Sequence, residues 1–179
     1  KWARLRPESP ALWWVSEDGR ELRFTYAMLA RQAAKSAAFF SDLGIGKGDH
    51  VMVITQRIPQ WWIAVLGLIR LGAVPIPGTP LLTAADVSGR LRVSGAKAII
   101  TDLDCMDKVV DFEGIRILAG ANRPGWVDFD HGVEQARDDM PPERTRSDDK
   151  AIIYFTSGTT GDAKMVLHTQ ASYGIAHAI

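Results

Sequence analysis

Apolar residues occur in segments of strand or helix length, separated by glycine, proline and polar residues. Residues 11–26 carry apolar positions on both sides of the turn dipeptide Asp18-Gly19, which indicates a β-hairpin. The following apolar positions recur at steps of three and four up to Gly44, which predicts a helix. These positions are Leu29, Ala33, Ala37, Phe40 and Leu43. Next, "HVMVIT" at 50–55 is a continuous, β-branched apolar run, which predicts a parallel strand covered on both faces.

The same alternation continues through the middle of the chain. Pro59 suits the first turn of a second helix that ends at Gly72. One face of that helix is apolar: Ile58, Trp62, Val65 and Ile69. Residues 73–80 predict a short strand that leads into a loop containing prolines.

A third helix is predicted at 84–95, with Thr83 as its N-cap. Gly89 lies inside that helix and weakens it by about 1 kcal/mol relative to alanine. Further strands are predicted at 97–101, 115–119 and 151–156.

Residues 120–150 are polar and contain three prolines, with a short helical patch near "GVEQARDD", which favours a surface connection over core. Strands that alternate with helices predict an α/β fold with a largely parallel sheet built from βαβ units. We expect residues 1–150 to form an N-terminal α/β subdomain, and residues 151–179 to begin the next subdomain.

Composition and charge narrow the function classes. The chain has 21 basic and 21 acidic residues, so it has no long-range attraction for nucleic acid or for an anionic membrane. No apolar run approaches the length of a membrane span, and the N-terminal sequence is not typical of a signal peptide. A single cysteine, Cys105, excludes an internal disulfide and fits a reducing compartment. The absence of an initiator Met and of a helix stop after residue 174 favours a piece of a longer protein.

The segment "YFTSGTTGDAKMVLH" at 154–168 has the composition of a phosphate-binding loop. Gly158 and Gly161 allow backbone N–H groups to converge on one anion. Four hydroxyl side chains can add donors: Thr156, Ser157, Thr159 and Thr160. Lys164 supplies a cation three residues after the second glycine. A glycine- and threonine-rich hairpin connection is the alternative for a loop of this composition.

This loop is not a Walker P-loop, which needs G-x-x-x-x-G-K-[ST] followed by a helix. Here only two residues separate the glycines, and Lys164 does not follow Gly161 directly. The residues after Lys164 favour a strand, so the predicted order is strand, loop, strand.

The segment resembles the phosphate-binding loop of adenylate-forming enzymes, which include acyl-CoA synthetases, luciferases and peptide-synthetase adenylation domains. The family signature is close to [ST]-S-G-[ST]-[ST]-G-x-P-K. The match covers Thr156 to Gly161 and Lys164, with Asp162 at the variable position and Ala163 where the family has proline. Met165 and several upstream segments, such as "GDHVMVITQRIPQWWIAVLGLIRLGAVPIPGT", are similar to the N-terminal part of medium-chain acyl-CoA synthetases. The resemblance extends from about residue 10 to the end.

The resemblance implies a ligase of fatty acid metabolism that converts a carboxylic acid and ATP to acyl-AMP and pyrophosphate, then transfers the acyl group to coenzyme A. It implies that residues 156–164 bind the ATP phosphates released as pyrophosphate, that Mg²⁺ arrives with ATP, and that the main catalytic residues lie downstream. This chain alone would then be inactive. The alternatives are another adenylating ligase, which activates acetate or an aryl acid or loads a carrier protein, and a non-catalytic nucleotide-binding relic. We expect a cytoplasmic location, with the mitochondrial matrix as alternative; the acid and the oligomeric state, a homodimer being one option, stay open.

Other residues have structural interpretations. The four tryptophans Trp13, Trp14, Trp61 and Trp62 are predicted to pack in the core, and His168 is predicted to be structural. Cys105 is predicted to be a buried, unreactive thiol. Asp102, Asp104 and Asp107 lack the spacing of a calcium loop. Arg57 and Arg90 either contact the 3′-phosphate of coenzyme A or face solvent, and the sequence does not decide between these roles.

Overall fold

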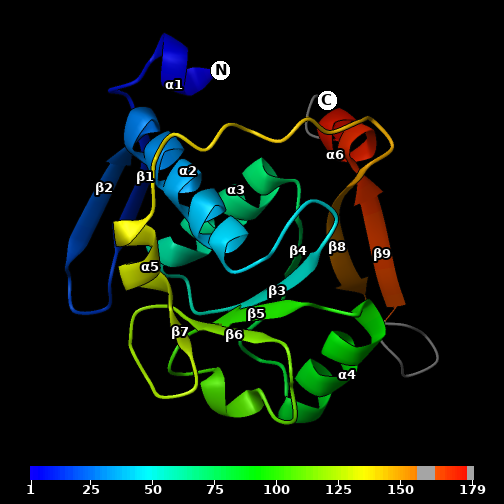
Figure 1. Cartoon of the computed structure of the whole chain (residues 1–179). Coiled ribbons are helices and arrows are strands. Elements are labelled where there is room, and N and C mark those ends of the chain that lie inside the picture. Colours follow the sequence, from blue (N-terminus) through cyan, green and yellow to red (C-terminus); the bar gives the residue numbers. More distant parts are fainter. Residues whose placement is uncertain (157–163, 177–179) are drawn as a thin grey trace.

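A parallel five-stranded sheet forms the centre of the protein (Figure 1). The computed structural model describes residues 1–156 and 164–176. The strands lie in the order β4-β3-β5-β6-β7, and every neighbouring pair is parallel. Their bounds are β3 (His50–Ile54), β4 (Val74–Pro77), β5 (Ala98–Thr101), β6 (Ile115–Leu118) and β7 (Val127–Asp128). This arrangement confirms the predicted α/β fold with a largely parallel sheet.

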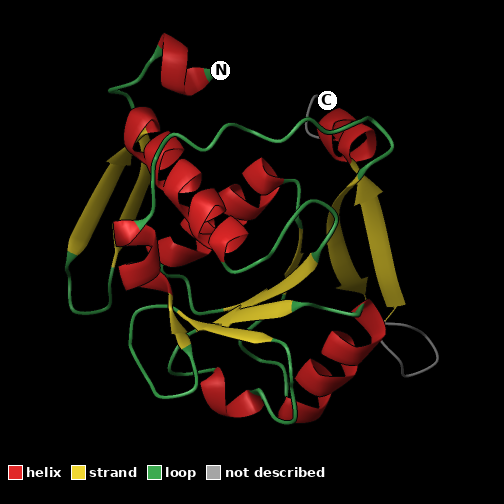
Figure 2. Cartoon of the chain, in the orientation of Figure 1, coloured by secondary structure: helices red, strands yellow, loops and turns green. Residues whose placement is uncertain are grey.

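Helices cover both faces of this sheet (Figure 2). Two long helices, α2 (Tyr26–Asp42) and α3 (Pro59–Leu71), pack on one face with α5 (Phe129–Gln135), around a core that includes Phe40, Val51 and Leu68. On the other face α4 (Ala84–Ser94) covers a second core that includes Met52, Val87 and Ile99. Because Val51 and Met52 are adjacent on β3, the alternation of side chains along a strand divides them between the two cores. Both are fully buried, as the continuous apolar run predicts.

The ends of the two long helices carry identifiable capping residues, of which the sequence predicted those of α3. Thr25 is the N-cap of α2, and its hydroxyl accepts a hydrogen bond from the N–H of Met28 at 3.3 Å. The helix α3 begins at Pro59 and ends at Leu71, and the next residue, Gly72, caps it with a φ of 74°, the left-handed conformation that glycine adopts without strain.

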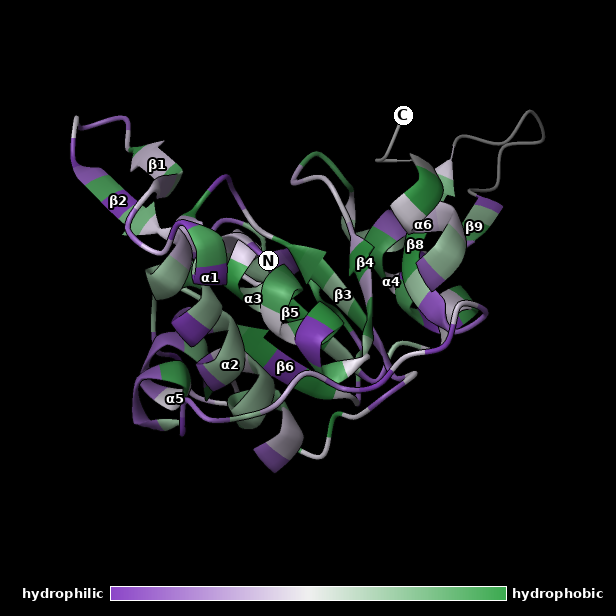
Figure 3. Ribbon diagram, turned by 90° about the horizontal axis from the view of Figure 1, so that it is seen from above, coloured by the Kyte–Doolittle hydropathy of each residue, from purple (hydrophilic) through white to green (hydrophobic). Residues whose placement is uncertain are grey.

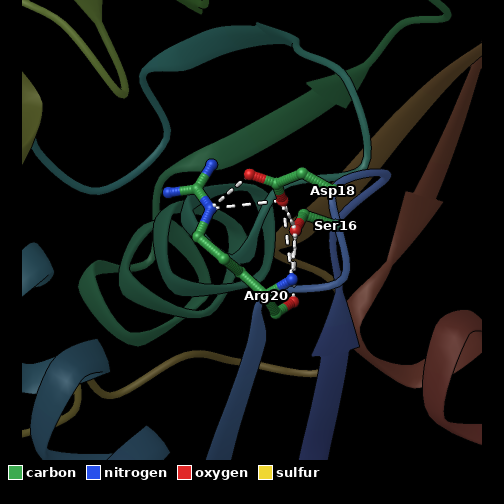
Figure 4. A network of polar contacts seen from close by, with 3 residues as sticks. All are labelled: Ser16, Asp18 and Arg20. Atoms are coloured by element: carbon green, nitrogen blue, oxygen red, sulfur yellow. Dashed lines mark hydrogen bonds and ion pairs between the residues drawn. The ribbon is translucent and has the colours of Figure 1, made fainter.

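The N-terminal segment forms a hairpin beside the central sheet. After the short helix α1 (Trp2–Leu5), strands β1 (Pro10–Val15) and β2 (Glu21–Thr25) pair antiparallel around the predicted turn. In that turn the Ser16 hydroxyl donates to the Asp18 carboxylate, which also accepts from Arg20 Nε at 2.9 Å (Figure 4). The hydrogen bond from Ser16 is the largest cause that lowers the pKa of Asp18, followed by bonds and charge from Arg20.

The C-terminal segment forms a second hairpin. Strands β8 (Lys150–Thr156) and β9 (Lys164–Thr169) pair antiparallel in a sheet of their own and lead into α6 (Gln170–Ala176). Ile153 of β8 is buried in the core under α4. By contrast, Met165, Val166 and Leu167 of β9 are each between 38% and 43% exposed, so the described residues leave that strand uncovered.

Residues 120–150 depart from the predicted surface connection. Phe129 and Val133 are 1% and 5% exposed and belong to the core beneath α2. The Phe129 ring lies edge-on to Phe39, with centroids 5.8 Å apart. The predicted helical patch is present as α5, but the prediction of a surface connection is wrong for 127–135. Two apolar residues four positions apart lie between polar flanks, and one helical turn brings them together on the buried side. Residues 137–149 are largely exposed, as predicted.

Hydropathy follows the layers of the fold (Figure 3). The central strands β3 and β5 are apolar except for His50 at the start of β3 and Thr101 at the end of β5, whereas the outer surfaces of α2 and α5 carry polar residues. In the part of the chain that the structure describes, no helix is both long and apolar enough to cross a membrane.

Thr83 begins α4 with a capping box. The Thr83 hydroxyl accepts from Asp86 N–H at 3.2 Å, and the Asp86 carboxylate accepts from Thr83 N–H at 3.0 Å. Thr83→Ala should therefore reduce the free energy of unfolding of the full-length protein by about 1 kcal/mol, measured by urea denaturation. Thr83→Ser keeps the hydroxyl and should lose much less. Equal losses in the two variants would contradict the capping role.

Candidate phosphate-binding site

The predicted loop joins the two strands of the C-terminal hairpin. Thr156 ends β8 and Lys164 begins β9, and the two residues are direct partners in the antiparallel register. The Thr156 hydroxyl lies 3.5 Å from the Lys164 carbonyl oxygen, to which it donates. Both side chains are exposed. The seven predicted site residues between them lie outside the described residues: Ser157, Gly158, Thr159, Thr160, Gly161, Asp162 and Ala163.

The strand after Lys164 decides between two kinds of phosphate loop. In a Walker loop, the lysine lies at the start of a helix, and the helix N-terminus contacts the phosphates. Here Lys164 is the first residue of a six-residue strand, as the sequence predicts. The described residues therefore confirm a strand on each side of residues 157–163, and the strand that begins at Lys164 excludes the Walker arrangement.

The base of this hairpin is buried, and the side chains at its other end are exposed. Ala151, Ile152 and Ile153 are at most 6% exposed, whereas Thr156 and Lys164 face solvent. A buried base holds the strands in one register, because a slip by one residue would turn Ile153 out of the core. The pair Thr156–Lys164 is thus presented at a fixed position beyond the core.

Arg90 of α4 lies beside this end of the hairpin. Its guanidinium carbon is 5.1 Å from the ring centroid of Phe155, the residue before Thr156. The structure therefore gives Arg90 a definite contact. Of the two roles that the sequence left open for Arg90, simple exposure to solvent does not apply.

Arg57 lies in a groove that the sequence did not reveal. The groove, about 880 Å³, lies where β3 ends, between the N-terminal hairpin and the loop after β4. Its lining includes Trp14, Arg20, Arg57, Leu81 and Asp104. A smaller cavity of about 410 Å³ shares Arg57 and is also lined by Trp61 and Trp62.

The position of this groove follows a general rule. In open α/β sheets, ligands bind beyond the carboxyl ends of strands where the strand order reverses, and here β3 has β4 on one side and β5 on the other. A polar loop after a buried strand, "TQRIP", is the sequence signal that could have located it.

A buried carboxylate fixes one wall of the groove. Asp102, at the end of β5, is 7% exposed and accepts hydrogen bonds from the N–H groups of Gln56 and Cys105. The Arg57 carbonyl accepts from Trp14 Nε1, which ties the N-terminal hairpin to the same loop. These side chains serve as structural braces, consistent with the absence of a calcium-loop pattern.

The tryptophans depart in part from the predicted core packing. Trp13 is 61% exposed and lies on the outer face of the N-terminal hairpin, where the Arg23 guanidinium is 4.4 Å from its ring centroid. The prediction is wrong for Trp13 because this two-stranded sheet has one outward face that no element of the described residues covers. Trp14, Trp61 and Trp62 are half-buried, and only Trp61 packs against the main core.

His168 and Cys105 have the structural positions that the sequence predicts. His168 is half-buried on β9, and its ring lies edge-on to that of Tyr154. Cys105 is 2% exposed, and burial is the main reason that its pKa rises to about 11. Within residues 1–156 and 164–176, no three His, Cys, Asp or Glu side chains gather in a way that could hold a metal ion.

The thiol of Cys105 should resist alkylation in the folded protein. A pKa of about 11, against an ordinary value of 9.0, lowers the thiolate fraction at pH 8 about a hundredfold. Burial slows the reaction further. Mass spectrometry after iodoacetamide treatment should therefore find Cys105 modified only in denatured protein, and rapid labelling of the native protein would contradict its buried position.

The chain is similar in sequence to a family of known enzymes along almost its whole length. A family model described as "AMP-binding enzyme" matches residues 1–178. The mitochondrial acyl-coenzyme A synthetase ACSM5 of Mus musculus is 38% identical over 97% of this chain and 32% of its own length. ACSM3 from the same organism, also a mitochondrial acyl-coenzyme A synthetase, is 38% identical over 97% of this chain and 31% of its length.

A solved structure with the same fold is the acetoacetyl-CoA synthetase from Streptomyces lividans. It superposes with a TM-score of 0.88 and 26% identity, over 99% of this chain and 30% of that protein. The chain thus spans about a third of the length of the relatives that it matches.

Proposed function

Since this chain belongs to the family of AMP-binding enzymes, we propose that it is the N-terminal part of an ATP-dependent acyl-CoA synthetase. The full-length protein activates a carboxylic acid, of the medium-chain fatty class or a related one, to acyl-AMP. It then transfers the acyl group to coenzyme A. The acyl-coenzyme A synthetases among the relatives support this reaction.

The observation that carries the proposal is the position of Lys164 opposite Thr156 at the exposed end of an anchored hairpin. A lysine ammonium is a compact charge that suits the β- and γ-phosphates of ATP. These phosphates leave as pyrophosphate when the acid attacks the α-phosphorus. A cation and N–H donors placed where negative charge increases lower the barrier to that step. We therefore keep residues 156–164 as the proposed ATP and pyrophosphate site.

Magnesium would arrive bound to ATP. Mg²⁺ commonly binds through substrate phosphates, several waters and one or two carboxylates, so it does not need a protein cage. Coenzyme A and the acid are the remaining small-molecule partners. The groove around Arg57 is a candidate surface for one of them, because Arg57 supplies a cation and Trp14 supplies an aromatic wall, whereas Arg20 is paired with Asp18.

The division of the chain near residue 150 is also part of the proposal. Strands β8 and β9 form a sheet separate from the five-stranded one, which supports a new subdomain that begins at 151. The mitochondrial names of the relatives support the mitochondrial matrix over the cytoplasm as the location.

An ATP–pyrophosphate exchange assay on the full-length protein tests this function. We expect exchange that depends on the acid and is fastest with medium-chain acids, followed by formation of acyl-CoA when coenzyme A is added. Residues 1–179 alone should show no exchange. A preference for acetate or aryl acids, or transfer to a carrier protein, would identify another adenylating ligase. No exchange with any acid, despite ATP binding, would favour a non-catalytic relic.

A further inference from the structure

Arg90 lies where the phosphate-binding hairpin meets the body of the protein. The side chain comes from the second half of α4, and its guanidinium covers the ring of Phe155 at 5.1 Å from the ring centroid. Figure 1 shows α4 beside the end of the hairpin that Thr156 and Lys164 form. This cation–π contact therefore joins α4 to the last residues of β8.

Arg90 forms no direct ion pair among the described residues. None of the ion pairs within 4.0 Å that they form includes Arg90. Arg90 Nε is buried and has no hydrogen-bond partner in the same residues. Asp86, one turn earlier on α4, accepts hydrogen bonds from Thr83, which are the largest causes of its lowered pKa, and the charge of Arg90 lowers that pKa further without a direct ion pair. The aromatic face of Phe155 is thus the main contact that offsets the partial desolvation of the guanidinium.

Phe155 transmits this contact to the hairpin end. Ile153 and Phe155 lie on the same face of β8, and both contact the core under α4, Ile153 fully buried and Phe155 partly. Phe155 pairs with Met165, and the next pair in the ladder is Thr156 with Lys164. Phe155 is therefore the last partly buried side chain of β8, and Thr156 after it is exposed.

We propose that Arg90 is a positioning residue for ATP phosphates, which acts by clamping Phe155 and so fixing the Thr156–Lys164 end of the hairpin. This role rests on the proposed function. Arg90 does not contact the phosphates in it. A loosely held strand end would bind the phosphates less tightly, because fixing Thr156 and Lys164 in place would then cost free energy when ATP binds.

A double-mutant cycle in the full-length protein tests this role. Arg90→Met keeps a long apolar side chain and removes the charge, and Phe155→Leu removes the aromatic face. Each should raise the KM for Mg·ATP about 3- to 30-fold, the range of a partly buried cation–π contact, with a smaller change in kcat. The double variant should be no worse than either single variant, because both break the same contact.

Two further variants separate positioning from general damage. Arg92→Met makes the same change two residues later on α4, where the side chain is exposed, and should leave the KM unchanged. Arg90→Lys retains a cation for the aromatic face and should restore most of the affinity. If the KM increases of the two single variants multiplied in the double variant, Arg90 would act independently of Phe155, and the proposal would be overturned. A lower Tm with unchanged KM would overturn it too, because it would show a purely structural role.

Calorimetric binding of pyrophosphate and of Mg·ATP to the same variants does not depend on catalysis. If the wild-type protein binds pyrophosphate but catalyses no exchange, the proposed function fails and the Arg90 cycle is still measured through Kd. If the protein exchanges normally and Arg90→Met binds as the wild type does, only the positioning role fails.

Discussion

Lys164→Ala in the full-length protein is expected to slow acyl-adenylate formation about 10²–10³-fold, the effect of removing one group that stabilises charge in a transition state. Lys164 is the first residue of β9 and faces solvent opposite Thr156, so the structure gives its ammonium no protein partner among the described residues. The proposed partner is the departing pyrophosphate, whose negative charge increases as the bond to the α-phosphorus breaks. Single-turnover measurement of acyl-AMP formation should show the loss mainly in the rate constant.

Lys150→Ala is the matched control for Lys164→Ala. Lys150 lies at the opposite end of β8, where its ammonium is 3.2 Å from His50 Nε2, and its loss should leave adenylation almost unchanged. Lys164→Arg keeps the charge with a different shape and should recover part of the rate. An unchanged rate in Lys164→Ala would remove the main support for the phosphate site and would favour a non-catalytic nucleotide-binding role.

Gly67→Ala is expected to destabilise the full-length protein by about 3 kcal/mol, although alanine normally favours a helix over glycine. Gly67 lies on α3 where it crosses α2. A methyl group there would lie 2.5 Å from Ser36 Oγ, 2.6 Å from Ser36 Cβ and 3.1 Å from the backbone nitrogen of Ala37. Since Ser36 is fully buried and Ala37 N is backbone, relief requires the two helices to separate. Urea denaturation would measure the loss as a lower midpoint, with the same dependence of the unfolding free energy on urea concentration as in the wild type.

Gly89→Ala is the opposite case in the same protein. Gly89 also lies inside a helix, α4, but no atom lies within 4 Å of the position that a methyl group would take. This substitution should therefore stabilise the protein by about 0.5–1 kcal/mol, the intrinsic preference of a helix for alanine. If both substitutions changed stability in the same direction, helix packing at Gly67 would not be the deciding factor.

Local patterns predicted most elements correctly because their signals lie within a few residues. Pro59 and Gly72 bound α3, and Thr83 caps α4, as expected from the φ angles and side-chain acceptors these residues supply. The alternation of strands and helices was sufficient to predict a parallel sheet, because a parallel pair needs a crossover connection. The phosphate loop stays a prediction from residue types and spacing, and the strands that flank it were confirmed.

The errors came where burial depends on residues far apart in the chain. Phe129 lies in a polar, proline-containing stretch, yet it is buried because Phe39 and Phe40, about 90 positions earlier, leave a space that its ring fills. Trp13 has the side chain of a core residue, yet within the part of the chain that the structure describes no element packs on its side of the N-terminal hairpin. A hydrophobic side chain favours burial, but the packing of the layers against one another decides which of these side chains are buried.

The sequence by itself thus determined the order of elements, the caps and turns that bound them, and the residues of the proposed phosphate site. Only the tertiary structure brought Arg90 over Phe155, Trp14 against the Arg57 carbonyl, and Asp102 against the Gln56 N–H group. Each of these contacts joins residues more than 40 positions apart. Their partners are chosen by the packing of whole helices and strands, for which no short pattern in the chain carries a signal.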